Sequence, residues 1–192
     1  MLRTAMFASA LALTFASPVL AQSTATAPGN LTAAQTGVSP MTGVTPTDYV
    51  RLAADSDMYE IQSSRLALSR SKRDNVKAFA KQMIADHTTT SKALMAALKN
   101  GERNIAKPPM KLSPDNAAKI ALLKKAPKAS FDDLYLQQQM AAHQTAWSLH
   151  TGFAMNGADP ALRQVAMTAV PIIERHFSHV RQMAPAGMAP AR

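Results

Sequence analysis

The sequence contains no cysteine, and this absence excludes several classes of protein. A disulfide framework, a thiolate zinc site, an iron–sulfur cluster and a cysteine nucleophile all require the missing thiol. Any bound metal ion must therefore be held by histidine, carboxylate or methionine side chains. Long apolar runs are also scarce: beyond the N-terminus, no stretch approaches the roughly 18 uncharged apolar residues that span a membrane.

What the chain does contain is enough apolar material for one globular domain. Hydrophobic residues make up 47% of the 192 residues, which suffices for a core in a domain of this length. Lys and Arg total 21 against 12 Asp and Glu, giving a formal net charge of +9. Basic residues gather between 99 and 128, whereas 129–162 contains no Lys or Arg. This distribution predicts one basic surface.

Residues 1–21 are typical of a secretory signal peptide. Arg3 precedes an uncharged apolar run, and Val19–Ala21 provides the short residues of a signal-peptidase site. The apolar run is too short for a membrane span. We therefore expect export across the inner membrane, most simply to the periplasm.

Two further segments lack the composition of a folded domain. Residues 22–44 are uncharged and rich in Ser, Thr, Ala and Pro, so we expect a disordered linker there. Residues 185–192 are rich in Pro and Ala and are expected to form a flexible tail. The folded domain should then cover residues 45–184.

Helix-start signals divide this domain into four long helices and one short helix. Ser, Thr or Asp stands before Pro or an acidic first turn at each start, as in Thr45-Pro46 and Asp159-Pro160. No window alternates with the period of a strand, so we expect no sheet. The expected long helices cover residues 46–70, 74–100, 131–156 and 160–183, and a short helix runs from 114 to 127.

The lengths of the connections predict the arrangement of these helices. The first two long helices are joined by very few residues, as are the last two, so each pair should form an antiparallel hairpin. The segment from Gly101 to Ser130 is long enough to cross the whole bundle. These features favour an all-α, ferritin-like four-helix bundle, with an up-down-up-down bundle as the alternative.

One ionisable residue falls near the midpoint of the apolar face of each long helix. Midpoints of neighbouring helices lie at the same height whether the helices are parallel or antiparallel, so these side chains should converge in the core. Buried ionisable groups without partners cost several kcal/mol, at order of magnitude, so such a cluster needs a compensating partner. The four residues are Glu60, His87, His143 and His176.

Two interpretations of this layer remain open at this point. In the first, the three imidazoles and the Glu60 carboxylate hold one transition-metal ion such as Zn, Fe, Mn or Cu. In the second, Glu60 accepts hydrogen bonds from the imidazoles, and the layer is a structural network that fixes the helix register.

Short motifs spread from Tyr49 to Met183 carry a resemblance to a known family. These residues resemble the secreted bacterial ferritin-like proteins of the DUF4142 family, a domain of unknown function whose members are often labelled outer membrane proteins. The resemblance implies a ferritin-like bundle in the cell envelope and brings no settled activity. It also implies that Glu60, His87, His143 and His176 match polar positions that recur in the family. The motifs are Glu60-Ile61, Leu66-Ala67, Val76-Lys77, Phe79-Ala80, Met83-Ile84, Asp86-His87, Phe131-Asp132, Tyr135, Met140–His143 and Pro171 with His176.

The sequence departs from the di-iron enzymes that share this kind of bundle. Those enzymes use Glu-x-x-His on two helices, whereas Ile84, Met140 and Ile173 stand three residues before the histidines here. Asp86 and Glu174 are close in sequence, but helix geometry turns them away from the histidine on their own helix. A single ion is therefore the expected occupant.

Motifs of enzyme active sites are missing. The sequence has no Gly-rich phosphate loop, no nucleophile elbow and no His-Glu-x-x-His, and one inward carboxylate leaves no acid–base pair. The residues therefore give no support to an enzymatic function.

An alternative function uses the basic segment between 99 and 128. In this hypothesis the Glu/His layer is structural, and the basic crossover contacts anionic lipid or acidic polysaccharide of the envelope. Nucleic acid is not an expected partner, because the protein is expected to be exported and lacks aromatic residues among its basic ones. Nothing in the sequence indicates an oligomeric state.

Overall fold

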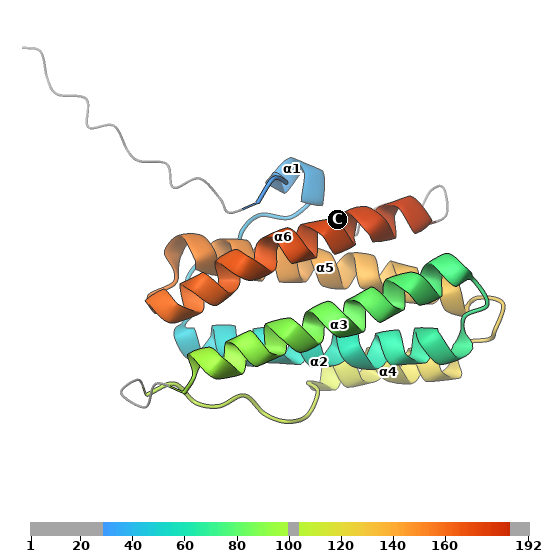
Figure 1. The fold of residues 1–192 in the computed structure, drawn as a ribbon, viewed down its shortest axis with the longest axis horizontal. Helices are drawn as coiled ribbons and strands as arrows, with labels where there is room; N and C mark the ends of the chain where they lie inside the picture. Colours follow the sequence, from blue (N-terminus) through green and yellow to red (C-terminus); the bar gives the residue numbers. More distant parts are fainter. Residues whose placement is uncertain (1–28, 100–103, 185–192) are drawn as a thin grey trace, which may run out of the picture.

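The computed structural model describes residues 29–99 and 104–184, and all regular structure within them is helical (Figure 1). This confirms the all-helical prediction, and no strand occurs in the described residues. None of the described helices has the length and hydropathy to cross a bilayer. The expected signal peptide and C-terminal tail lie outside the described residues. The helices are α1 (Ala33–Thr36), α2 (Pro46–Arg70), α3 (Asp74–Ala97), α4 (Pro114–Lys125), α5 (Phe131–Asn156) and α6 (Pro160–Met183).

Side-chain caps explain several of the helix starts. Thr45 accepts a hydrogen bond from the Asp48 amide at the start of α2, and Asp159 caps α6 in the same way. The end of α3 differs from the prediction, because the helix stops at Ala97 rather than at Asn100. The predicted last residue, Asn100, lies outside the described residues.

The four long helices pack as a bundle in two sequential pairs (Figure 1). Helices α2 and α3 are joined by residues 71–73, and α5 and α6 by residues 157–159, so the members of each pair are antiparallel. Helix α3 also packs against α6, and α2 against α5. Helix α4 lies in the connection between the two pairs and packs on the outside of α2 and α5.

The apolar core is divided along the length of the bundle. One cluster contains Tyr59, Met83 and Tyr135, and a second contains Leu94 and Phe153. A third, smaller apolar cluster is formed by residues of α5 and α6, and each long helix also carries buried polar residues. These polar residues are therefore enclosed by apolar packing.

The expectation of a disordered linker was wrong for residues 29–44, while residues 22–28 lie outside the described part of the chain. Residues 29–44 pack along α5 and α6: the Glu174 carboxylate accepts hydrogen bonds from the Asn30 and Leu31 amides at 2.7 and 3.0 Å. Further along, the Met41 amide donates to the Ser148 carbonyl at 2.8 Å. The acceptors that order this segment are on distant helices, so its own composition did not reveal them.

Candidate metal centre

The structure brings three of the four predicted residues into direct proximity. His87 on α3, His143 on α5 and His176 on α6 are buried, with exposed fractions of 3%, 0% and 0%. Each ring offers a nitrogen, and these nitrogens lie within 4.8 Å of one another. Glu60 on α2 is also buried and lies beside this group, with Oε1 3.8 Å from His143 Nδ1, which is too far for a hydrogen bond.

Each of the three imidazoles uses one nitrogen to bind an acceptor outside the group. His87 Nδ1 lies 2.8 Å from Asp57 Oδ1 and His176 Nε2 lies 2.7 Å from Asp86 Oδ2. His143 Nδ1 lies 2.8 Å from the Gln139 carbonyl oxygen. Because carboxylates and carbonyls accept hydrogen bonds, these three ring nitrogens carry the protons.

The other nitrogen of each ring is buried and has no hydrogen-bond partner among the described residues. These atoms are Nε2 of His87, Nε2 of His143 and Nδ1 of His176. In a neutral imidazole with the opposite nitrogen protonated, each of them is a lone pair. Lone pairs cannot satisfy one another, so the group can accept a cation or a hydrogen-bond donor between its three rings.

Glu60 is held by Gln139, which also positions His143. The Gln139 side-chain amide donates to Glu60 Oε2 at 2.6 Å, while its main-chain carbonyl accepts from His143. Glu60 Oε1 is buried without a partner among the described residues. Burial raises the pKa of Glu60 to about 7, against the lowering effect of His87 and Gln139.

Burial and neighbouring charges give the three histidines different protonation behaviour. Burial, together with the other two rings, holds the pKa of His143 well below its usual value. Burial is also the main cause that lowers the pKa of His176 to about 4. Burial acts in the same direction on His87, but Asp57 and the other nearby carboxylates outweigh it and raise the pKa. His143 and His176 are therefore neutral at neutral pH, as metal ligands must be.

Sequence reasoning missed the acceptors that orient the rings. Asp57 is one helical turn before Glu60, on the same face of α2, and that spacing was an available signal. Asp86 was considered only in relation to His87 on its own helix, whereas the structure pairs it with His176 on α6. This contact was missed because it depends on how α3 and α6 pack.

Two other polar residues of the core lie outside the candidate centre. The buried carboxylate of Glu174 accepts a hydrogen bond from the Trp147 indole at 3.0 Å and binds the N-terminal segment. His150 is buried with Nδ1 3.0 Å from the Tyr49 hydroxyl. Both have structural partners and are not candidate ligands.

Comparison with known proteins gives one match. Residues 30–183 match the family described as Domain of unknown function (DUF4142). No curated protein and no solved structure matches the chain. The matched range includes the histidine group, Glu60 and the N-terminal segment that packs on α5 and α6.

Proposed function

The chain belongs to the family described as Domain of unknown function (DUF4142), and from its buried site we propose that it binds a single transition-metal ion. The ligands are Nε2 of His87, Nε2 of His143 and Nδ1 of His176. Three imidazoles suit Zn, Fe, Mn or Cu. Glu60 is not one of the residues whose donor atoms lie within 4.8 Å of one another, and it approaches His143 at Nδ1 rather than at the ligand Nε2. We therefore give Glu60 the role of a neighbouring carboxylate that accepts a hydrogen bond from a metal-bound water.

One observation carries this proposal: three buried ring nitrogens converge with no hydrogen-bond partner in the described part of the chain, while the opposite nitrogen of each ring is already bound. Histidines that ligate metals usually donate their second N–H to a carboxylate or backbone carbonyl, which fixes the tautomer and the ring orientation. Asp57, Asp86 and the Gln139 carbonyl fill these three roles. Leaving a buried polar atom unpaired costs about 1–3 kcal/mol, and an ion shared by the three rings removes that cost.

The alternative of a self-contained polar network has less support. In that hypothesis Glu60 accepts hydrogen bonds from the imidazoles. In the structure its nearest approach to His143 is 3.8 Å, and the same His143 nitrogen already donates to Gln139. No hydrogen bond joins Glu60 Oε1 to any of the three free ring nitrogens, and none joins these nitrogens to one another.

We place this site in an exported, ferritin-like bundle. The two hairpins, with a long connection that carries α4, support the ferritin-like assignment. The signal-like residues 1–21 support export and a periplasmic location. A dinuclear centre is not part of the proposal, because the residues one turn before the three histidines are apolar.

The deciding experiment measures metal in protein prepared without a polyhistidine tag. The purified protein, or apoprotein reloaded with Zn(II) or Co(II), should retain close to one equivalent by elemental analysis. His143→Ala should abolish retention while circular dichroism shows intact helices. His179→Ala is the matched control, because His179 is on α6 one turn beyond His176 and outside the group. Protein that holds no metal as purified, and retains neither Zn(II) nor Co(II) after reloading, would refute the proposal.

A second candidate function is contact with an anionic envelope surface through α4. Leu122 is 56% exposed, and the neighbouring Lys124 and Lys125 are also exposed. An exposed apolar side chain beside two lysines suits the surface of an anionic membrane. Reversing both lysines to Glu should weaken binding to phosphatidylglycerol vesicles at low salt, whereas Lys81→Glu on α3 should not. Equal binding of all three proteins would dismiss this function.

A further inference from the structure

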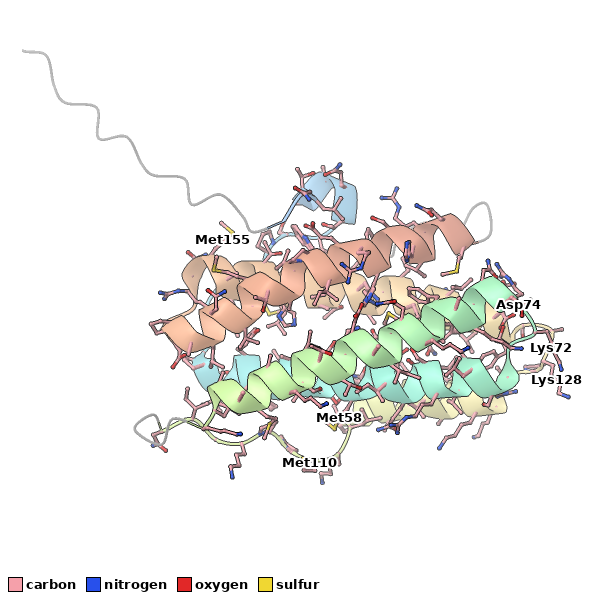
Figure 2. All side chains as sticks on the ribbon, in the orientation of Figure 1. Met58, Lys72, Asp74, Met110, Lys128 and Met155 are labelled. Carbon is pink, nitrogen blue, oxygen red and sulfur yellow. The ribbon has the colours of Figure 1, made fainter. Side chains whose placement is uncertain are left out.

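Three methionine side chains line one groove on the surface of the bundle. Met58 of α2, Met95 of α3 and Met110 of the connection before α4 surround a cavity of about 120 Å³. Figure 2 shows Met58 and Met110 close together where this connection runs beneath α2. The three methionines therefore come from segments that are distant in sequence.

The exposure of these methionines is unusual for an apolar side chain. Large hydrophobic residues are mostly buried in the described part of the chain, and those exposed are Met95, Met110, Leu122 and Met167. Two of them line this groove, at 37% and 89% exposure. Methionine usually fills gaps in a core, so exposed methionines around one cavity indicate a ligand.

We propose that Met58, Met95 and Met110 form a second metal site, which takes a soft monovalent ion of the Cu(I) type. Thioether sulfur is a soft ligand that selects Cu(I) over harder divalent ions. The chain has no cysteine, so methionine supplies its only soft donors. The buried histidine group offers nitrogen donors instead, so the two sites differ in the ions that they favour.

The groove is connected to the buried centre by two hydrogen bonds. Ser91 lines the groove, and its hydroxyl donates to Asp57 Oδ2 at 3.0 Å. The other oxygen of Asp57 is the acceptor for the candidate ligand His87 at 2.8 Å. An ion held by the methionines would therefore lie on the side of the bundle formed by α2 and α3, the helices that carry Asp57 and His87.

The test uses protein labelled with ¹³C at the methionine methyl groups and titrated with Ag(I), a redox-stable substitute for Cu(I). The methyl resonances of Met58, Met95 and Met110 should shift together and saturate at one equivalent. Replacing any of the three by Leu keeps the apolar volume and removes the sulfur, so affinity should fall about tenfold or more. Met167→Leu is the control, because Met167 is 46% exposed on α6, away from this groove.

Two outcomes would overturn the proposal. One is an equal response from Met167 and the groove methionines, and the other is unchanged Ag(I) affinity in the Met58→Leu/Met95→Leu/Met110→Leu protein. The second outcome would leave the groove as an apolar contact surface, since leucine preserves that property. Repeating the titration with His143→Ala separates the two sites, because the thioether site should still bind Ag(I) when the buried centre cannot hold Zn(II).

Discussion

The imidazole of His176 on α6 donates through Nε2 to the carboxylate of Asp86 on α3, at 2.7 Å. Burial acts to raise the pKa of Asp86, but hydrogen bonds from Gln82, His176 and Arg175 outweigh it and hold the pKa below its usual range. Asp86 is therefore an ionised acceptor, and it fixes the tautomer that leaves His176 Nδ1 as a lone pair. This contact joins α3 to α6, and it also leaves His176 Nδ1 free to bind a metal ion.

Replacing Asp86 by Asn should weaken metal binding without unfolding the protein. The amide oxygen can still accept from His176, but the negative charge that increases the basicity of the ring is lost. We expect affinity for Zn(II) to fall about tenfold to a hundredfold, measured by competition with a chromophoric chelator. Asp133→Asn is the control, because Asp133 is exposed near the start of α5. Equal affinities of the Asp86 variant and the wild type would remove Asp86 from the description of the centre.

Replacing Glu174 by Ala should release residues 29–44 from the bundle. Glu174 accepts hydrogen bonds from the Asn30 and Leu31 amides and from the Trp147 indole, so the change leaves these donors unpaired. We expect a loss of about 2–4 kcal/mol in the free energy of unfolding and faster amide hydrogen exchange in residues 29–44. Zn(II) affinity should be retained, since Glu174 contacts none of the candidate ligands. Unchanged exchange would show that other contacts hold the segment.

Helix starts and inward-facing residues could be predicted because both are local properties. Thr45-Pro46 begins α2 through its own hydrogen bonds, and the position of His143 along α5 fixes its height in the bundle. The contact between Asp86 and His176 could not be predicted, since it depends on how far each helix is rotated about its axis. The ordered N-terminal segment and the position of Met110 depend on partners far away in sequence.

His150 should make the protein less stable in acid. Burial lowers its pKa to about 4 in the folded state, whereas an unfolded histidine binds a proton below about 6.5. Above pH 6.5 both states are neutral, so the effect is absent there. As the pH falls from 6.5 to 4, only the unfolded state gains the proton, and the free energy of unfolding should drop by up to about 3 kcal/mol from this residue.

The measurement compares urea unfolding at pH 7 and pH 4.5 in the wild type and in His150→Asn. Asparagine places a polar atom near the position of Nδ1, where it can still meet the Tyr49 hydroxyl. The variant should lose less stability between the two pH values than the wild type. His179→Asn, the control on α6, should show the wild-type difference. A variant with the same acid sensitivity as the wild type would assign that sensitivity to other groups.

Glu60→Gln should change metal affinity and apoprotein stability in opposite directions. Burial disfavours the charged form of Glu60 and leaves one of its oxygens without a partner among the described residues, so the neutral amide should raise the free energy of unfolding of the apoprotein by about 1–2 kcal/mol. Among the described residues, Glu60 is the carboxylate that lies beside the three imidazoles without a hydrogen bond to any of them, and the same change removes it. Affinity for Zn(II) should then fall about tenfold, and the visible spectrum of the Co(II) protein should shift.

The paired readout separates a ligand site from a purely structural layer. If Glu60 served only to hold the helices in register, its replacement would lower apoprotein stability and leave the Co(II) spectrum unchanged. Ser63→Ala is the matched control, because Ser63 shares the Gln139 amide with Glu60 but brings no charge to the centre. If Glu60 destabilises the metal-free protein and strengthens metal binding, its role is in binding the ion. A residue that served only as a packing contact would not lower the stability of the metal-free protein.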